Sequence, residues 1–195
     1  MKLNSISVFC ASSPGFEDIW GQEAMKVGKY FAENNITLVY GGGRVGLMGA
    51  VADGCLAYQG KVIGVIPHFL NSKEIGHNDV TELIVVENMH ERKLLMNDLC
   101  EGAIALPGGF GTMEELFEMI TWAQLGLHQK PVGILNTNGF YDHLIKFMDH
   151  MVEVGLLNIP NRNMLLVGDT IEDLVQQMEA YQAPDVPKWL NKENS

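Results

Sequence analysis

The chain has 195 residues, of which 47% are hydrophobic and 19% are charged. This composition is typical of a globular protein and excludes intrinsic disorder, collagen-like repeats and coiled coils. Thirteen lysines and arginines stand against 24 aspartates and glutamates, so the formal net charge is −11. So acidic a chain is a poor candidate for binding nucleic acid or an anionic membrane, although a helix N-terminus can still hold a small phosphorylated ligand.

The cysteines and the N-terminus indicate the compartment. Cys10, Cys55 and Cys100 are widely spaced, and no CxxC or CxxH pair occurs. We therefore expect neither a disulfide framework nor a metal site. The first residues lead directly into an apolar segment without a signal-peptide pattern, and no apolar run reaches 18 residues. These features predict a cytoplasmic protein with no membrane partner.

Short apolar runs alternate with longer amphipathic segments along the chain. The expected strands are Ser5–Ala11, Ile36–Tyr40, Lys61–Ile66, Glu82–Val86, Gly102–Leu106, Pro131–Leu135 and Met164–Val167. The expected helices are Glu17–Glu33, Leu47–Gln59, Met89–Cys100, Thr112–Leu127, Tyr141–Val154 and Ile171–Tyr181. The polar segment His68–Thr81 is expected to be a long loop, and Ala183–Ser195 a mobile tail.

Strands that are apolar on both faces and alternate with helices indicate a mostly parallel sheet covered on both sides. We expect one doubly wound α/β domain of six to seven strands over residues 1–182, followed by a tail over residues 183–195. Ligands bind such sheets at the carboxyl ends of the strands, near the point where the strand order reverses. The glycine clusters after the second and fifth strands therefore mark the expected site.

Pro107–Glu115 reads PGGFGTMEE and lies between an expected strand and an expected helix. Glycines let the backbone approach a ligand closely, and free amides at a helix start attract a phosphate. Thr112 can cap the helix or donate its hydroxyl to that phosphate, and Glu115 lies one turn further on. A capping box of Thr112 and Glu115 is the alternative, but it explains neither three glycines in four positions nor the preceding proline.

Tyr40–Gly49 reads YGGGRVGLMG and contains GxGxxG after a strand. A dinucleotide site also requires an acidic residue at the end of the next strand, and that strand ends in VIP instead. NAD is therefore disfavoured. We expect Gly42 and Gly43 to form a wall of a nucleotide pocket, with a tight strand-to-helix turn as the alternative.

Met89–Lys93 reads MHERK at the start of an expected helix. Cations are disfavoured there by the helix dipole, so Arg92 and Lys93 favour an anionic partner, although a solvated helix face is equally consistent. Glu74 lies in the long loop and by itself is typical of a surface carboxylate.

Together, PGGFGTMEE, the upstream MHERK and YGGGRVGLMG resemble the LONELY GUY family, the cytokinin riboside 5′-monophosphate phosphoribohydrolases. The first segment matches the pattern PGGxGTxxE, and the resemblance covers the chain from about Ser5 to Tyr181. Many members carry the older label "possible lysine decarboxylase". A pyridoxal decarboxylase needs a Schiff-base lysine and a carboxylate for the pyridinium nitrogen, and the sequence sets up no such pair.

The resemblance implies a Rossmann-like fold and a homodimer or larger homo-oligomer. It also implies a small-molecule substrate, an adenosine-type 5′-monophosphate, whose N-glycosidic bond is hydrolysed without a metal or other cofactor. Arg92 and Glu115 are implied as the catalytic pair. The implied substrate contacts are Glu74, Arg92, Lys93, Gly109, Phe110, Gly111, Thr112, Met113, Glu114, Glu115 and Thr121.

Cleavage of an N-glycosidic bond builds positive charge on the ribose. We expect Glu115 to stabilise that charge, to hold the ribose hydroxyls or to activate water. Arg92 is expected to orient the substrate and stabilise charge on the phosphate or base, because its high pKa makes it a poor proton donor. The main alternative is a non-catalytic nucleotide or molybdenum-cofactor carrier on the same fold, against which the intact Arg92 and Glu115 argue.

Overall fold

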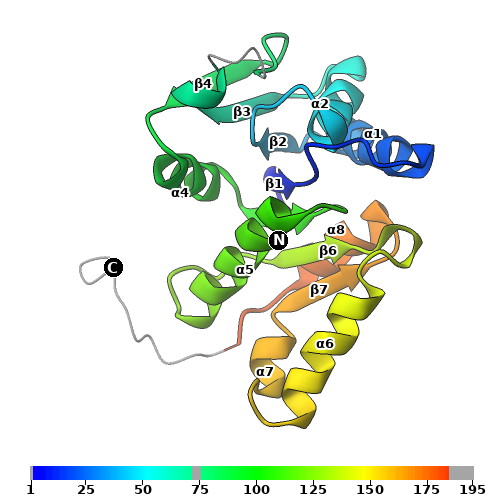
Figure 1. Ribbon diagram of the computed structural model, residues 1–195, viewed down its shortest axis with the longest axis vertical. Coiled ribbons are helices and arrows are strands. Elements are labelled where there is room, and N and C mark those ends of the chain that lie inside the picture. The colour runs from blue at the N-terminus through cyan, green and yellow to red at the C-terminus, as the bar shows by residue number, and fades with distance from the viewer. Residues whose placement is uncertain (1, 72–75, 185–195) are drawn as a thin grey trace.

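The computed structural model describes residues 2–71 and 76–184. Glu74 lies outside these residues, as do residues 185–195 of the expected tail. One seven-stranded parallel sheet runs through the described part of the chain, in the order β4-β3-β2-β1-β5-β6-β7 (Figure 1). The strands are β1 (Ser5–Phe9), β2 (Thr37–Tyr40), β3 (Val62–Pro67), β4 (Glu82–Val86), β5 (Gly102–Ala105), β6 (Val132–Leu135) and β7 (Leu165–Gly168).

Helices cover both faces of this sheet. They are α1 (Asp18–Glu33), α2 (Gly46–Ala57), α3 (His68–Asn71), α4 (Met89–Leu99), α5 (Phe110–Gln124), α6 (Asp142–Glu153), α7 (Ile159–Arg162) and α8 (Ile171–Ala180), with a 3₁₀ turn, η1 (Thr137–Gly139). One apolar core joins α1, α2 and α8 to one face, and a second joins α4, α5 and α6 to the other. The predicted doubly wound α/β fold is confirmed.

The strand order reverses between β1 and β5. From β1 the chain crosses through α1 to β2 on one side, and from β5 it crosses through α5 to β6 on the other. The segments that leave the carboxyl ends of β1 and β5 therefore diverge. A crevice at such a reversal is where open α/β sheets bind their ligands.

The structure departs from the sequence expectations mainly at element ends and in short elements. Helix α5 begins at Phe110, two residues before the predicted start at Thr112, because Gly109 already has the extended backbone of an N-cap. The predicted loop His68–Thr81 begins with the four-residue helix α3. Neither α7 nor η1 was predicted, since one turn or less is too short to show helical periodicity.

None of the described helices is both long and apolar enough to cross a membrane.

Helices α1 and α2 lie side by side at one end of the molecule and touch through glycines (Figure 1). A Cβ atom on Gly28 would stand 2.1 Å from the carbonyl oxygen of Val51, and one on Gly54 would stand 2.4 Å from the carbonyl oxygen of Met25. The two backbones therefore approach so closely that no side chain fits between them at these positions.

Gly28→Ala is expected to lower the free energy of unfolding by about 1–3 kcal/mol, because a methyl group overpacks a contact made by backbone atoms that cannot rotate away. Chemical denaturation followed by circular dichroism measures the change.

Gly21→Ala is the matched control on the same helix, since a Cβ there meets no atom within 4 Å. This substitution should raise the free energy of unfolding by about 0.5–1 kcal/mol through helix propensity alone. Equal effects of the two substitutions would contradict the close α1–α2 contact.

Candidate active site

A cavity of about 320 Å³ lies at the carboxyl ends of the central strands, where the strand order reverses. All three motifs reach it: Gly41 and Gly43 follow β2, Arg92 comes from α4, and the start of α5 closes one side. The lining residues are Val8, Phe9, Cys10, Ala11, Ser12, Gly41, Gly43, Met48, Ile66, Leu70, Arg92, Gly109, Phe110, Gly111, Thr112 and Glu115.

An ion pair between Arg92 and Glu115 crosses this cavity. The Nη1 atom of Arg92 lies 3.1 Å from Oε1 of Glu115, and the two side chains are only 10% and 11% exposed. The Nε–H group of Arg92 also donates to the carbonyl oxygen of Val65 at 3.2 Å. The guanidinium is therefore held from two sides, by the end of β3 and by α5.

Gly41 provides the room for this guanidinium. A Cβ atom on Gly41 would stand 2.0 Å from Nη2 of Arg92. Any larger residue at position 41 would have to displace the arginine. The glycine after β2 is thus required by the position of Arg92, which the GxGxxG pattern alone does not explain.

Burial changes the acidity of the Glu115 carboxyl group. Loss of solvation raises its pKa above the ordinary value, and the neighbouring Arg92 guanidinium lowers it by less. The described residues donate no hydrogen bond to Oε2, the second carboxylate oxygen. Glu115 therefore has one oxygen fixed by Arg92 and one available to a ligand.

The PGGFGT segment forms a helix start that opens on the cavity. Gly109 is the N-cap of α5 and has no side-chain cap, so the capping box of Thr112 and Glu115 is wrong: Thr112 is already the third helical residue. A Cβ atom on Gly109 or Gly111 would meet no protein atom within 4 Å. The free amides of this first turn therefore face space that a ligand can occupy.

Lys93 ties α4 to α5 outside the cavity. Its Nζ atom lies 2.6 Å from Oε1 of Glu114 and 2.9 Å from Oε1 of Glu118. The anionic partners of Arg92 and Lys93 in this structure are thus three carboxylates of α5. This arrangement departs from the solvated helix face that the sequence left open.

The glycine loop after β2 is held in place by the residues that precede β4. Gly43 forms an antiparallel bridge with Gly76, and the amide of His77 donates to the carbonyl oxygen of Gly42 at 2.9 Å. The buried His77 ring lies 3.0 Å, Nε2 to Oδ1, from Asp53 of α2. These contacts position the wall of the cavity that contains Gly41 and Gly43.

The structure separates the expected site residues into groups. Arg92, Glu115, Gly43 and the run 109–112 line the cavity, whereas Lys93, Met113, Glu114, Thr121 and Gly42 do not. Glu74 lies outside the described residues. Sequence reasoning missed Gly41 as a lining residue, together with Cys10 at the end of β1 and the apolar side chains of Met48, Ile66 and Leu70.

The sequence did contain a signal that Cys10 lines the site. It follows a central strand of a doubly wound sheet, where ligands bind. The apolar lining residues had no such signal, since each is an ordinary core residue type. Burial raises the pKa of the Cys10 thiol far above its ordinary value, so this group is not an ionised nucleophile at neutral pH.

Solved structures similar to this one share its fold at low sequence identity. The molybdenum cofactor binding protein of Rippkaea orientalis is 20% identical, with a TM-score of 0.68 over 92% of this chain and 98% of that one. The Moco carrier protein of Chlamydomonas reinhardtii is also 20% identical, with a TM-score of 0.67 over 92% of this chain and 99% of that one.

Comparison of amino-acid sequences identifies the family of this chain, whereas the structural neighbours show only its fold. The family model described as "possible lysine decarboxylase" matches residues 48–178. The probable cytokinin riboside 5′-monophosphate phosphoribohydrolase LOGL2 of Oryza sativa subsp. japonica is 43% identical over 98% of this chain and 78% of its own length. The cytokinin riboside 5′-monophosphate phosphoribohydrolase LOG3 of Arabidopsis thaliana is 43% identical over 92% of this chain and 84% of its own length. The chain therefore belongs to the family of the cytokinin riboside 5′-monophosphate phosphoribohydrolases.

Proposed function

We propose that this protein hydrolyses the N-glycosidic bond of adenine-type nucleoside 5′-monophosphates, with AMP or a cytokinin riboside monophosphate as substrate. Water enters, and the free base and ribose 5-phosphate leave. The observation that carries the proposal is the buried Arg92–Glu115 pair beside the open helix start at 109–112, in a chain 43% identical to named phosphoribohydrolases.

The phosphate of the substrate would bind at the start of α5. The free amides there, together with the positive end of the helix dipole, favour an anion even in a protein of net charge −11. The unobstructed space at Gly109 and Gly111 admits phosphate oxygens close to the backbone. The apolar side chains of Met48, Ile66 and Leu70 would contact the base at the other wall.

Glu115 and Arg92 would act on the bond that breaks. As the base departs, the ribose becomes positively charged, and the free oxygen of Glu115 would lie next to the developing charge. Arg92 fixes the other oxygen of this carboxylate, and its positive charge opposes, without outweighing, the rise in the pKa of Glu115 that burial causes. Its remaining N–H groups would orient the substrate through the phosphate or the base.

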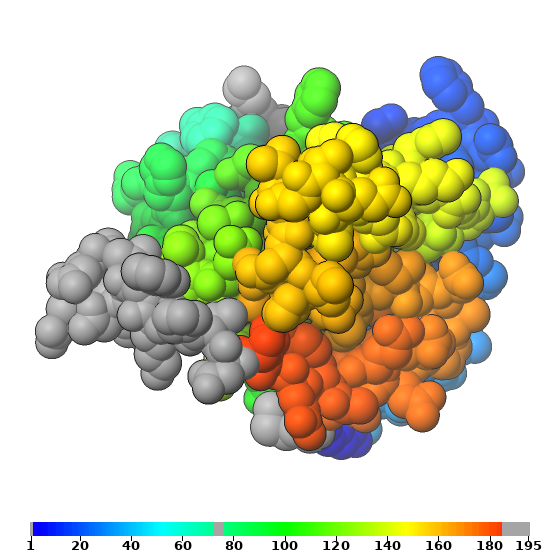
Figure 2. Space-filling model, turned by 90° about the horizontal axis from the view of Figure 1, so that it is seen from below, coloured from blue at the N-terminus to red at the C-terminus, as the bar shows by residue number. Residues whose placement is uncertain are grey.

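We further propose that residues 1–182 form a single nucleotide-binding domain, supported by the continuous sheet, and that the protein is cytoplasmic. A homodimer or larger homo-oligomer is supported by large apolar side chains at the surface. On α6, α7 and the connection between them, which stand at the front of the face shown in Figure 2, Phe147, Leu156 and Ile159 are 55%, 85% and 62% exposed. On α5, Phe117 is 37% exposed.

Light scattering at micromolar concentration is expected to give at least twice the chain mass of 21.6 kDa. The reason is that exposed apolar patches on soluble proteins commonly mark interfaces. A mass near that of one chain across the whole concentration range would exclude the proposed assembly.

Incubation of the purified protein with AMP is expected to release free adenine, detected by chromatography. Adenosine should react at least about a hundredfold more slowly in kcat/KM, since the missing phosphate removes several hydrogen bonds of about 1.5–3 kcal/mol each. Equal rates on both would refute the phosphate site at α5. Nucleotide binding without any adenine release would favour a non-catalytic carrier.

Glu115→Gln is expected to lower kcat by about 10²–10⁴ with little change in nucleotide affinity, because glutamine keeps the size of the side chain and removes only its charge. The ground-state sugar carries no positive charge, so binding should not depend on that charge. Glu118→Gln is the matched control, because it removes the same charge one turn further along α5 from a residue outside the cavity lining. A folded Glu115→Gln protein with near-normal kcat would remove Glu115 from the mechanism.

The wild-type pH profile provides a second readout of the same residue. If the ionised carboxylate is required, kcat falls as the pH drops through the pKa of Glu115. Burial raises that pKa, so the acid limb should lie above the value of about 4.3 that is usual for glutamate. The residual activity of the glutamine variant should lack this limb.

A further inference from the structure

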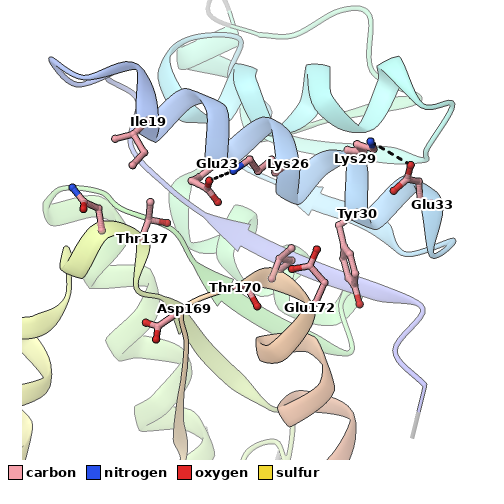
Figure 3. Close-up of a pocket in the computed structure, with 12 residues that line it drawn as sticks. Ile19, Glu23, Lys26, Lys29, Tyr30, Glu33, Thr137, Asp169, Thr170 and Glu172 are labelled. Atoms are coloured by element: carbon pink, nitrogen blue, oxygen red, sulfur yellow. Dashed lines mark hydrogen bonds and ion pairs between the residues drawn. The ribbon is translucent and has the colours of Figure 1, made fainter.

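A second cleft, of about 590 Å³, lies between α1 and the start of α8 (Figure 3). It lies on the face of the sheet opposite α5 and shares no lining residue with the proposed active site. Its volume falls within the range of about 300–1,000 Å³ that is usual for small-molecule sites. Nothing in the proposed hydrolysis uses it.

A buried hydroxyl group without a partner faces this cleft. Thr137, in the turn after β6, is 5% exposed, and its Oγ1 atom has no hydrogen-bond partner among the described residues. Its side chain points into the space between α1 and α8 (Figure 3). A buried hydroxyl left without a hydrogen bond is unfavourable, so this atom indicates a polar group that the chain itself does not supply.

Some charged side chains around the cleft have an ion-pair partner, and others have none among the described residues. On α1, Lys26 pairs with Glu23, and Lys29 lies 3.7 Å from Glu33, so both lysines have a partner on their own helix. Across the cleft, Asp169 and Glu172 form no ion pair with any described residue. Figure 3 shows these two side chains at the start of α8. The cleft therefore has two carboxylates available to a cation.

The side chains without a partner determine which kind of ligand would fit the cleft. Two ionised carboxylates can only accept hydrogen bonds, and the Thr137 hydroxyl can accept one as well. An ammonium group is the complement, since it carries positive charge and three donors and has no acceptor. The described residues contain no cluster of three His, Cys, Asp or Glu groups that could hold a metal ion.

The remaining wall suits an alkyl chain. Ile19 and Tyr30 from α1 and Ile171 from α8 line the cleft between its polar groups. Burial, with smaller contributions from Glu172 and Glu179, raises the pKa of the Tyr30 phenol, so this ring stays neutral. An aromatic face beside carboxylates is a favourable surface for an alkylammonium group.

We propose that the α1–α8 cleft binds a small aliphatic diamine or polyamine. One ammonium group lies at Glu172 and another at Asp169, the Thr137 hydroxyl accepts a hydrogen bond from an amino group, and the methylene chain lies along the apolar wall. This site goes beyond the proposed hydrolase function, because its lining is entirely separate from that of the nucleotide cavity.

Calorimetric titration of the full chain with putrescine and with spermidine tests the proposal, at about 0.15 M salt to screen non-specific attraction to the acidic surface. We expect one saturable site per chain. Thr137→Val keeps the shape of the side chain and should weaken binding at least about tenfold, through loss of one hydrogen bond to a charged group. The double variant Asp169→Asn, Glu172→Gln should abolish saturable binding.

The matched control is Asp98→Asn with Glu82→Gln, which removes the same charge from two exposed carboxylates outside the cleft. It should bind like the wild type. The melting temperature and the rate of AMP hydrolysis should be unchanged in all three variants, which would exclude misfolding. Absence of saturable binding, equal weakening in the control, or an unaltered Thr137→Val variant would each overturn the proposal. Tight binding of Mg²⁺ that depends on the same carboxylates would also overturn it, in favour of a simple cation site.

Discussion

The contact on which the proposed site depends is the buried ion pair between Arg92 and Glu115. It joins the helix that follows β4 to the helix that follows β5, across the point where the strand order reverses. Several local features are consequences of holding this guanidinium in place. Residue 41 must be glycine to leave room for it, and β3 must present the Val65 carbonyl oxygen to its Nε–H group. Outside the cavity, the contacts of Lys93 with Glu114 and Glu118 hold the same two helices together.

Keeping a carboxylate in this position is unfavourable for folding. The pKa of Glu115 is higher in the folded protein than in the unfolded chain, because burial outweighs the attraction of Arg92. Its contribution to stability is therefore fully present only below the unfolded pKa, and it is lost as the pH rises through the folded one. At neutral pH the two apolar cores on the faces of the sheet must offset this local cost. Such a cost in folding stability is common where function requires a charged group in a site shielded from water.

The same reversal of strand order leaves a second space on the opposite face. Helix α1 packs backbone to backbone on α2 through Gly28 and Gly54, on the β2 side of the sheet. Helix α8 packs over β6 and β7, at the other end of the strand order. A cleft therefore remains between α1 and the start of α8. Its charges differ from those of the nucleotide cavity, because neither of its carboxylates at the start of α8 forms an ion pair with a described residue, although Glu172 raises the pKa of Lys26 from a longer distance.

The fold class, all seven strands and the six long helices could be predicted from the sequence, since hydrophobic periodicity and strand-ending glycines are local signals. The glycine clusters after β2 and β5 also predicted where the candidate site lies. Which charges meet depends instead on how distant elements pack. Arg92 and Glu115 are 23 residues apart, and no local pattern pairs them or assigns Lys93 to Glu114 and Glu118. Cys10 and Leu70 join one cavity, and Thr137 and Tyr30 another, because helices from distant parts of the chain pack on a shared sheet. Such contacts follow from the register and crossing of whole elements, and they are therefore absent from any short stretch of sequence.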